Sequence, residues 1–250
     1  MLTAQLDAVR QRIRQACARA GRDPHSVTLV AVTKTVPAEL IRQAMALGLV
    51  EFGENRVQEA RDKLAALGAQ ARQHDGHPIR WHLVGRLQRN KARHAVELFD
   101  AIHSIDSAEL ATELERRLAN WAGGSRQRHE PRATSGEATL DVFIQVHVTG
   151  EPTKSGCRPQ DAEALADVVL DCPHLRLKGL MTIPPFSHDP KHARPHFRRL
   201  AELRDTLTRA VGQPFGSMKL SMGMSGDFEV AIEEGADVIR IGTALFGERT

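Results

Sequence analysis

Eight short apolar runs alternate with amphipathic helical stretches along this 250-residue chain. Such alternation is typical of βαβ units, in which connecting helices cover parallel strands. Eight units in a chain of this length predict a (β/α)8 TIM-type barrel, an α/β fold forming one domain over residues 1–250. An open doubly wound sheet is the alternative, but no Gly-x-Gly-x-x-Gly follows the first strand. The expected strands are 28–34, 49–53, 79–85, 101–105, 140–148, 177–183, 218–222 and 238–242.

Helical periodicity fills the intervals between these strands. An additional first helix carries Leu2, Leu6, Val9, Ile13 and Cys17 on one face and is expected to cover the core. The segment 122–138 is rich in Gly, Ser, Arg and Pro without an apolar period, which predicts an exposed insertion. The other expected helices are 37–47, 57–67, 108–121, 159–170, 196–210 and 228–234.

Charge and cysteine usage narrow the class of protein. The formal net charge is only +3, too small to indicate nucleic acid by itself but suited to a phosphorylated ligand. The three cysteines are widely spaced and lack metal-ligand spacing, which indicates a reducing compartment. No apolar run reaches transmembrane length. We therefore expect a cytoplasmic protein with no membrane partner and no metal.

Two local clusters invite sharper hypotheses. The basic residues of 86–94 lack interleaved aromatic residues for base stacking, so a solvated helix start or an electrostatic funnel is favoured over nucleic-acid binding. His188, His192 and His196 are spaced by four, but Pro190 and Pro195 interrupt the helix that would align them. Neither cluster predicts a site.

Lys34 closes the first apolar run, at the C-terminal end of a strand expected to be buried on both faces. Partly apolar surroundings disfavour the ammonium, so the amine is more often free and nucleophilic, as a Schiff-base lysine requires. Most strand-end lysines simply extend to solvent, however. Lys34 alone does not identify the chemistry.

Two glycine-rich turns follow the last two expected strands, at the end of a parallel barrel where phosphate is often held. They read Leu-Ser-Met-Gly-Met-Ser-Gly-Asp-Phe over 220–228 and Arg-Ile-Gly-Thr-Ala-Leu-Phe-Gly over 240–247. Glycines let backbone N–H groups approach an anion, hydroxyl groups add donors, and helix N-termini favour phosphate. Ordinary capped turns are the alternative, but two such turns together predict a phosphate site.

Arg240 lies inside the eighth expected strand, where a charge is costly unless it is paired. A buried salt bridge with a core carboxylate is one interpretation. A ligand contact inside the barrel mouth is the other.

Eight motifs together resemble the pyridoxal phosphate homeostasis proteins (YggS and PROSC type), in order and over nearly the whole chain. The resemblance implies a single-domain barrel similar to the N-terminal domain of alanine racemase. It also implies a role in intracellular homeostasis and delivery of pyridoxal 5′-phosphate (PLP), without efficient catalysis of its own. The motifs lie at 28–34, 52–55, 81–85, 87–91, 154–156, 179–181, 221–225 and 240–243.

The resemblance also implies roles for individual residues. Lys34 would form an aldimine with the cofactor aldehyde, Arg240 would face the pyridine nitrogen, and Asn55 would lie near the ring face or its hydroxyl side. Two further residues, His82 and Met222, would line the pocket. The phosphate would be held by Ser221, Gly242 and Thr243, with Gly223 and Ser225 nearby.

A small PLP-dependent amino-acid racemase is the alternative function. Arginine stays protonated and hardly gives a proton to the ring nitrogen, and a neutral pyridine is a weaker electron sink. Racemases of the alanine racemase type pair their lysine with a tyrosine from an additional domain, whereas this chain contains no tyrosine and offers no such domain. A third hypothesis is a phosphosugar or aldol-type barrel whose Lys34 bonds to substrate instead of cofactor.

Lys154 follows the fifth expected strand and would lie on the ligand face, where a second lysine could accept the cofactor during transfer. A solvated loop lysine is the simpler interpretation. The expected partners are PLP and apo PLP-dependent enzymes. A closed barrel has no exposed sheet edge, so we expect a monomer.

Overall fold

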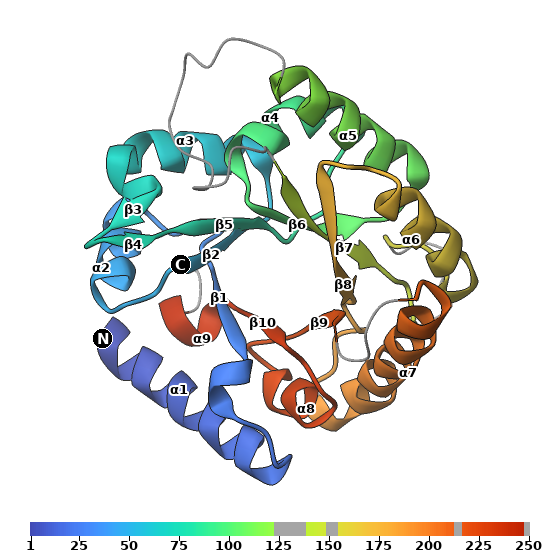
Figure 1. Ribbon diagram of the computed structural model, residues 1–250. Coiled ribbons are helices and arrows are strands. Elements are labelled where there is room, and N and C mark those ends of the chain that lie inside the picture. The colour runs from blue at the N-terminus through green and yellow to red at the C-terminus, as the bar shows by residue number, and fades with distance from the viewer. Residues whose placement is uncertain (123–138, 149–154, 213–216, 248–250) are drawn as a thin grey trace.

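Eight strands of the computed structural model close into a parallel barrel, in the order β1-β10-β9-β8-β7-β6-β5-β2 (Figure 1). The structure describes residues 1–122, 139–148, 155–212 and 217–247. The prediction of a (β/α)8 barrel is confirmed. The barrel strands are β1 (Thr28–Val32), β2 (Glu51–Glu54), β5 (Arg80–Leu83), β6 (Ala101–Ile105), β7 (Leu140–Gln145), β8 (Leu175–Met181), β9 (Lys219–Met224) and β10 (Val238–Ile241).

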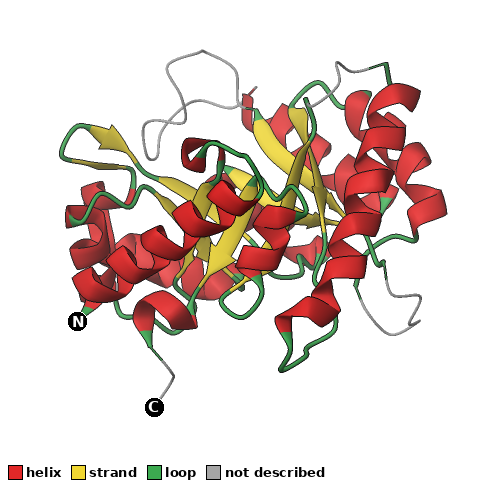
Figure 2. Ribbon diagram, turned by 90° about the horizontal axis from the view of Figure 1, so that it is seen from below, coloured by secondary structure: helices red, strands yellow, loops and turns green. Residues whose placement is uncertain are grey.

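Helices surround the barrel on its outer side (Figure 2). The helix after β10 is very short, and α1 packs against it and against α8, so the first helix completes the ring (Figure 1). No helix of the described ranges is both long and apolar enough to span a membrane. The helices are α1 (Leu2–Arg19), α2 (Ala38–Ala46), α3 (Val57–Leu67), α4 (Ala92–Leu98), α5 (Ala108–Ala122), α6 (Ala162–Leu170), α7 (Arg194–Ala210), α8 (Phe228–Glu233) and α9 (Thr243–Phe246).

The predicted first helix is confirmed in detail. Its five apolar residues, Leu2, Leu6, Val9, Ile13 and Cys17, are all buried in the layer between helices and barrel. Spacing at three and four residues places them on one face, because a helix turns once in 3.6 residues.

Two small elements were not predicted. Helix α4 lies where only a helix start was expected, and β3 (Gln73–His74) pairs with β4 (His77–Pro78) as a hairpin outside the barrel. Asp75 and Gly76 both have positive φ, at 47° and 80°, which is the backbone that an Asp-Gly hairpin turn requires. The Asp-Gly pair was the available signal.

The barrel interior differs chemically from the layer outside it. Strand side chains alternate between the two, so each strand contributes to both. At the N-terminal end the interior is charged, with Asp141 2.7 Å from Arg80 and 2.8 Å from Arg176. An apolar cluster inside the barrel consists of Val30, Val32, Val84, Phe143, Met181 and Val238.

Candidate functional site

Five neighbouring strands, β9, β10, β1, β2 and β5, bring the predicted residues to one side of the barrel. Val30 pairs with Arg240 and Ala31 with Ile241, so the chain after β1 leaves the barrel beside the chain after β10. A Cβ added to Gly242 would lie 3.4 Å from the carbonyl oxygen of Val32. Lys34 is therefore carried to the same edge of the barrel as Gly242 and Thr243.

Lys34 lies in a turn, half-buried, two residues beyond the last residue of β1. The prediction that the strand runs to Lys34 is wrong, because the next residue, Thr35, adopts φ +65° and turns the chain. A β-branched residue in this region is strained and needs support from its surroundings. The Thr35 hydroxyl donates to the carbonyl oxygen of Lys34 at 2.6 Å, and its N–H donates to the Glu59 carboxylate.

A buried ion pair supports this turn from the side of α3. The Lys63 ammonium lies 2.8 Å from Glu54 and 2.7 Å from Glu59, and it also donates to the carbonyl oxygen of Thr33. Glu54 is completely buried, and its Oε1 also accepts a hydrogen bond of 2.5 Å from the Thr33 hydroxyl. Burial raises the pKa of Glu54, while Lys63 and Thr33 oppose that rise. Glu54 belongs to the 52–55 motif but had no predicted role, and Lys63 lies outside the predicted motifs.

Arg240 points into the barrel and is almost completely buried. Its Nη1 donates to the carbonyl oxygen of Ser221 at 2.8 Å and to the Ser221 hydroxyl at 2.6 Å, and its Nη2 donates to the carbonyl oxygen of Thr182 at 2.9 Å. Among the described residues no carboxylate forms an ion pair with it, which disfavours the buried salt bridge considered above. Burial lowers its pKa to about 10, so the guanidinium is still charged at neutral pH.

A chain of polar side chains continues from Ser221 across the barrel interior. The Ser221 hydroxyl lies 2.8 Å from Nδ1 of His103, and Nε2 of His103 lies 2.9 Å from Nδ1 of His82. Nε2 of His82 lies 2.5 Å from the Glu51 carboxylate at the first residue of β2. We call Glu51, His82, His103, Ser221 and Arg240 the interior relay. Burial lowers the pKa of His103 well below its usual value, with nearby His82 and Arg240 adding to the effect.

Ser225 is the hydroxyl that joins the two glycine-rich turns. Its Oγ accepts from the N–H groups of Gly242 and Ala244, at 3.2 Å each. Thr243 lies between these two residues and is exposed. Ser221, by contrast, is completely buried, and its hydroxyl is hydrogen-bonded to Arg240 and His103. The geometry therefore favours Ser225 over Ser221 as the serine beside Gly242 and Thr243.

The side chain of Met222 does not line the barrel interior, contrary to the prediction that it would line the pocket. Ser221 points into the barrel, so strand alternation turns Met222 outward, into the completely buried layer between barrel and helices. Gly223 has φ +94°, and an added Cβ would meet Ala231 Cβ at 2.6 Å and Phe228 Cα at 2.9 Å. The glycine is thus required by the close approach of α8.

Asn55 follows β2 directly and is half-buried. Gly85 lies against its backbone, since an added Cβ would be 2.3 Å from the Asn55 carbonyl oxygen. Gly85, the last residue of the 81–85 motif, therefore allows the chain after β5 to pass close to the backbone of Asn55. Lys154 and the predicted insertion 122–138, apart from Ala122 at the end of α5, lie outside the described residues.

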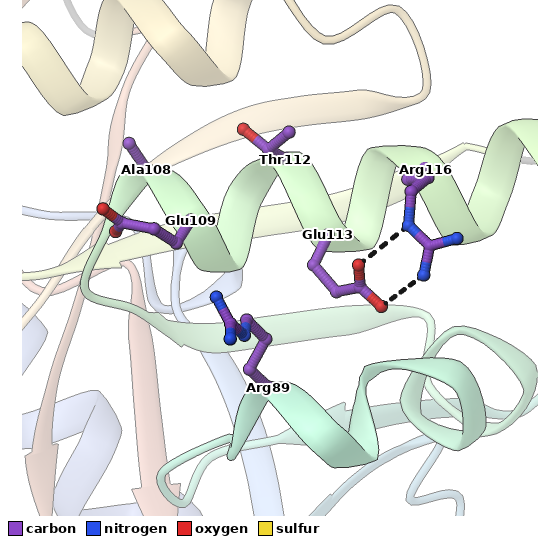
Figure 3. A pocket seen from close by; sticks show the side chains of 6 residues that line it. All are labelled: Arg89, Ala108, Glu109, Thr112, Glu113 and Arg116. Atoms are coloured by element: carbon purple, nitrogen blue, oxygen red, sulfur yellow. Dashed lines mark hydrogen bonds and ion pairs between the residues drawn. The ribbon is translucent and has the colours of Figure 1, made fainter.

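The basic cluster of 86–94 lies beside acidic groups. Arg93 and His94 lie within 3.8 Å and 3.5 Å of Glu97, and Arg86 lies 3.9 Å from Asp106. A groove of about 410 Å³ lies between Arg89 and α5. Figure 3 shows Arg89 facing α5, and Glu113 bonded to Arg116. These acidic partners agree with a solvated helix surface. The described residues contain no group of three or more ligands that could hold a metal ion.

Comparison with known proteins gives the family. The model of the alanine racemase N-terminal domain matches residues 4–250. A pyridoxal phosphate homeostasis protein of Aquifex aeolicus is 43% identical over 245 residues, which cover 98% of this chain and 97% of that protein. One of Pseudomonas aeruginosa is 45% identical over 241 residues, covering 96% and 93%. This chain belongs to the pyridoxal phosphate homeostasis protein family. The resemblance stated from the motifs is confirmed.

Solved structures agree with this membership. PipY of Synechococcus elongatus PCC7942, solved with PLP bound, has a TM-score of 0.77 and 34% identity, covering 99% of this chain and 100% of that one. The alanine racemase of Clostridium difficile 630 has a TM-score of 0.70 at 12% identity and shares the fold. This chain corresponds to 56% of that racemase chain, so the family barrel is one part of the larger enzyme.

Proposed function

We propose that this protein binds PLP at the C-terminal mouth of the barrel, bonded through Lys34, and serves PLP homeostasis and delivery in the cytoplasm as a monomer. The observation that carries the proposal is the buried guanidinium of Arg240, which donates to oxygens of Ser221 and Thr182. Arg240 lies on β10, which pairs with β1, the strand that leads to Lys34. Relatives that cover nearly the whole chain are named for this function, and PipY was solved with PLP bound.

The residues of the mouth fit this cofactor. Three of the five N–H donors of Arg240 make hydrogen bonds within the described part of the chain, which leaves two for an acceptor such as a pyridine nitrogen. Thr243 offers an exposed hydroxyl to a phosphate, and Ser225 keeps its own O–H to donate because its oxygen only accepts from Gly242 and Ala244. Asn55 follows β2 at the mouth, while His82 lies deeper in the barrel, bonded to His103 and Glu51. The amine of Lys34 condenses with an aldehyde by losing one water.

The same geometry argues for a carrier. Bound PLP supplies an electron sink to amino-acid chemistry, and its strength depends on a protonated ring nitrogen. Arg240 donates a hydrogen bond but keeps its own proton, and the chain contains no tyrosine to act as a second base. A racemase-like activity is the second candidate, supported only by the shared fold of alanine racemase.

The deciding measurement is the visible spectrum of the purified protein titrated with PLP, compared with Lys34→Ala. We expect a yellow band in the wild type that Lys34→Ala lacks, and borohydride should fix one pyridoxyl phosphate group on the peptide carrying Lys34. Lys191→Ala is the matched control, because Lys191 is an exposed lysine on the connection after β8. A protein that stays colourless but is trapped by borohydride with a carbonyl substrate would indicate a phosphosugar barrel instead.

Carrier and enzyme are separated by a second assay on the loaded protein. We expect PLP to pass to an apo PLP-dependent enzyme, and amino-acid racemisation no faster than with free PLP. Turnover that disappears in Lys34→Ala would contradict the carrier proposal and establish the racemase.

A further inference from the structure

The interior relay crosses the barrel from its N-terminal end to the proposed cofactor pocket. Glu51 is the first residue of β2 and is still 19% exposed at its side chain, whereas His82, His103, Ser221 and Arg240 are buried. The relay thus links a partly solvated carboxylate to the guanidinium beside the pocket. Nothing in the function proposed above requires such a link.

Requiring an acceptor for each buried O–H and ring N–H gives every hydrogen bond of the relay a direction. Arg240 can only donate, so the Ser221 hydroxyl oxygen accepts from it, and among the described contacts of that hydroxyl Nδ1 of His103 is the acceptor for its O–H. His103 must then carry its proton on Nε2 and donate to Nδ1 of His82. His82 in turn carries its proton on Nε2 and donates to the Glu51 carboxylate.

All four bonds therefore run one way, from a cation to an anion, and both imidazoles are neutral. Protonating His103 would make both of its nitrogens donors and leave the Ser221 O–H without an acceptor in the relay, which is costly in a buried site.

We propose that Glu51, His82 and His103 are positioning residues that hold Arg240 as a fixed donor toward the ring nitrogen of the cofactor. This inference rests on the proposed function, since it names what sets the electronics of the bound PLP. With Arg240 held by hydrogen bonds to Ser221 and Thr182, and with Ser221 held in turn by the relay, the ring nitrogen would meet a donor that does not release its proton. The relay thereby keeps bound PLP a poor catalyst and suits it to storage.

The first test needs no cofactor. In the apo protein labelled with ¹⁵N-histidine, long-range ¹H–¹⁵N spectra should show His82 and His103 as neutral Nε2–H tautomers at neutral pH, assigned with His82→Gln and His103→Met. A proton on Nδ1 of His103, or a doubly protonated ring, would overturn the relay. This measurement decides the relay even if the wild type takes up no PLP, an outcome that would reject only the proposed function.

The second test removes the Glu51 carboxylate, the last acceptor of the relay. Glu51→Ala should shift the absorption maximum of bound PLP and weaken its binding about tenfold, because the last acceptor is lost. Glu51→Gln should restore both, since its amide oxygen can accept the same hydrogen bond. Glu115→Ala is the matched control, because Glu115 pairs with His174 at 2.6 Å outside the barrel.

An unchanged spectrum and affinity in Glu51→Ala would show that the relay does not act on Arg240. If Glu51→Ala does not fold, His103→Met breaks the relay at its centre and is expected to give the same spectral shift. An unshifted band in that variant would likewise contradict the proposal.

Discussion

The Lys63 ammonium lies 2.8 Å from the Glu54 carboxylate, and both groups are screened from solvent behind the turn that carries Lys34. Lys63 belongs to α3 and Glu54 is the last residue of β2. The pair therefore joins a helix to the barrel beside Thr33 and Lys34, which follow the end of β1. The ammonium also donates to the carbonyl oxygen of Thr33. The position of the proposed cofactor lysine is therefore set by residues that do not touch the pocket.

Lys63→Met should destabilise the protein by about 3 kcal/mol, because it leaves Glu54 buried without its cation. PLP binding should weaken as well, since the turn before Lys34 loses a hydrogen bond. Urea unfolding measures the first effect and PLP titration the second. The control is Arg158→Ala, whose pair with Asp161 is exposed, and its loss should leave the stability almost unchanged. Equal effects in the two variants would contradict this account.

Ser225→Ala should reduce the preference for PLP over pyridoxal, which lacks the phosphate. The Ser225 hydroxyl accepts from the N–H groups of Gly242 and Ala244, so its loss should disorganise the turn proposed to hold the phosphate. We expect the ratio of the two affinities to fall about tenfold. Ser221→Ala should weaken both ligands alike, because Ser221 acts through Arg240. The reverse ranking would restore Ser221 as the phosphate ligand.

Gly223→Ala should destabilise the fold by about 2 kcal/mol or more, since the added methyl would meet α8 and the backbone has positive φ. Gly226→Ala is the matched change three residues later, where an added Cβ meets nothing within 4 Å. Its cost should stay within about 0.5 kcal/mol. Thermal unfolding of the two variants compares them, and equal stabilities would refute the packing explanation.

Arg194→Leu should lower stability near neutral pH but not in acid. Hydrogen bonding from Arg194 lowers the pKa of Glu233. Burial raises the pKa of Glu234, but hydrogen bonds from Arg198 and Arg194 outweigh this effect, so its pKa is lowered as well. A lowered folded-state pKa contributes stability that is present above the ordinary value of 4.5 and lost as pH falls through the folded-state value. Since Arg194 is about one-third exposed, we expect about 1 kcal/mol.

Urea unfolding of wild type and Arg194→Leu over a range of acid pH checks this dependence, and the gap between them should close as the pH falls. Arg61→Leu removes an exposed pair with Asp62 and should show almost no gap at any pH. A gap for Arg194→Leu that grows in acid would have the wrong sign.

Much of the fold could be predicted because burial imposes a local pattern. The apolar run before Lys34 and the spacing of Leu6, Val9 and Ile13 each report which side of an element faces the core. The motifs also carried most of the candidate site, since the turns after β9 and β10 are contiguous in sequence. The bounds of β1 could not be predicted, because the turn at Thr35 depends on Glu59 and Lys63 from another element.

The interior relay had almost no sequence signal. His103 and Ser104 are the polar residues of a strand whose other residues are apolar, and this is the hint that a polar group points into the barrel there. Its partners His82 and Ser221 lie 21 and 118 residues away.

The barrel, the family and the residues from which a PLP site is proposed could all be predicted, because periodicity and short motifs are properties of neighbouring residues. The surroundings of Arg240 and the serine next to Gly242 became known from the folded chain. Barrel closure brings β10 against β1 and aligns inward side chains from strands far apart in the chain. Hydrogen-bond direction across those strands depends on distances of a few ångströms, which no linear pattern encodes.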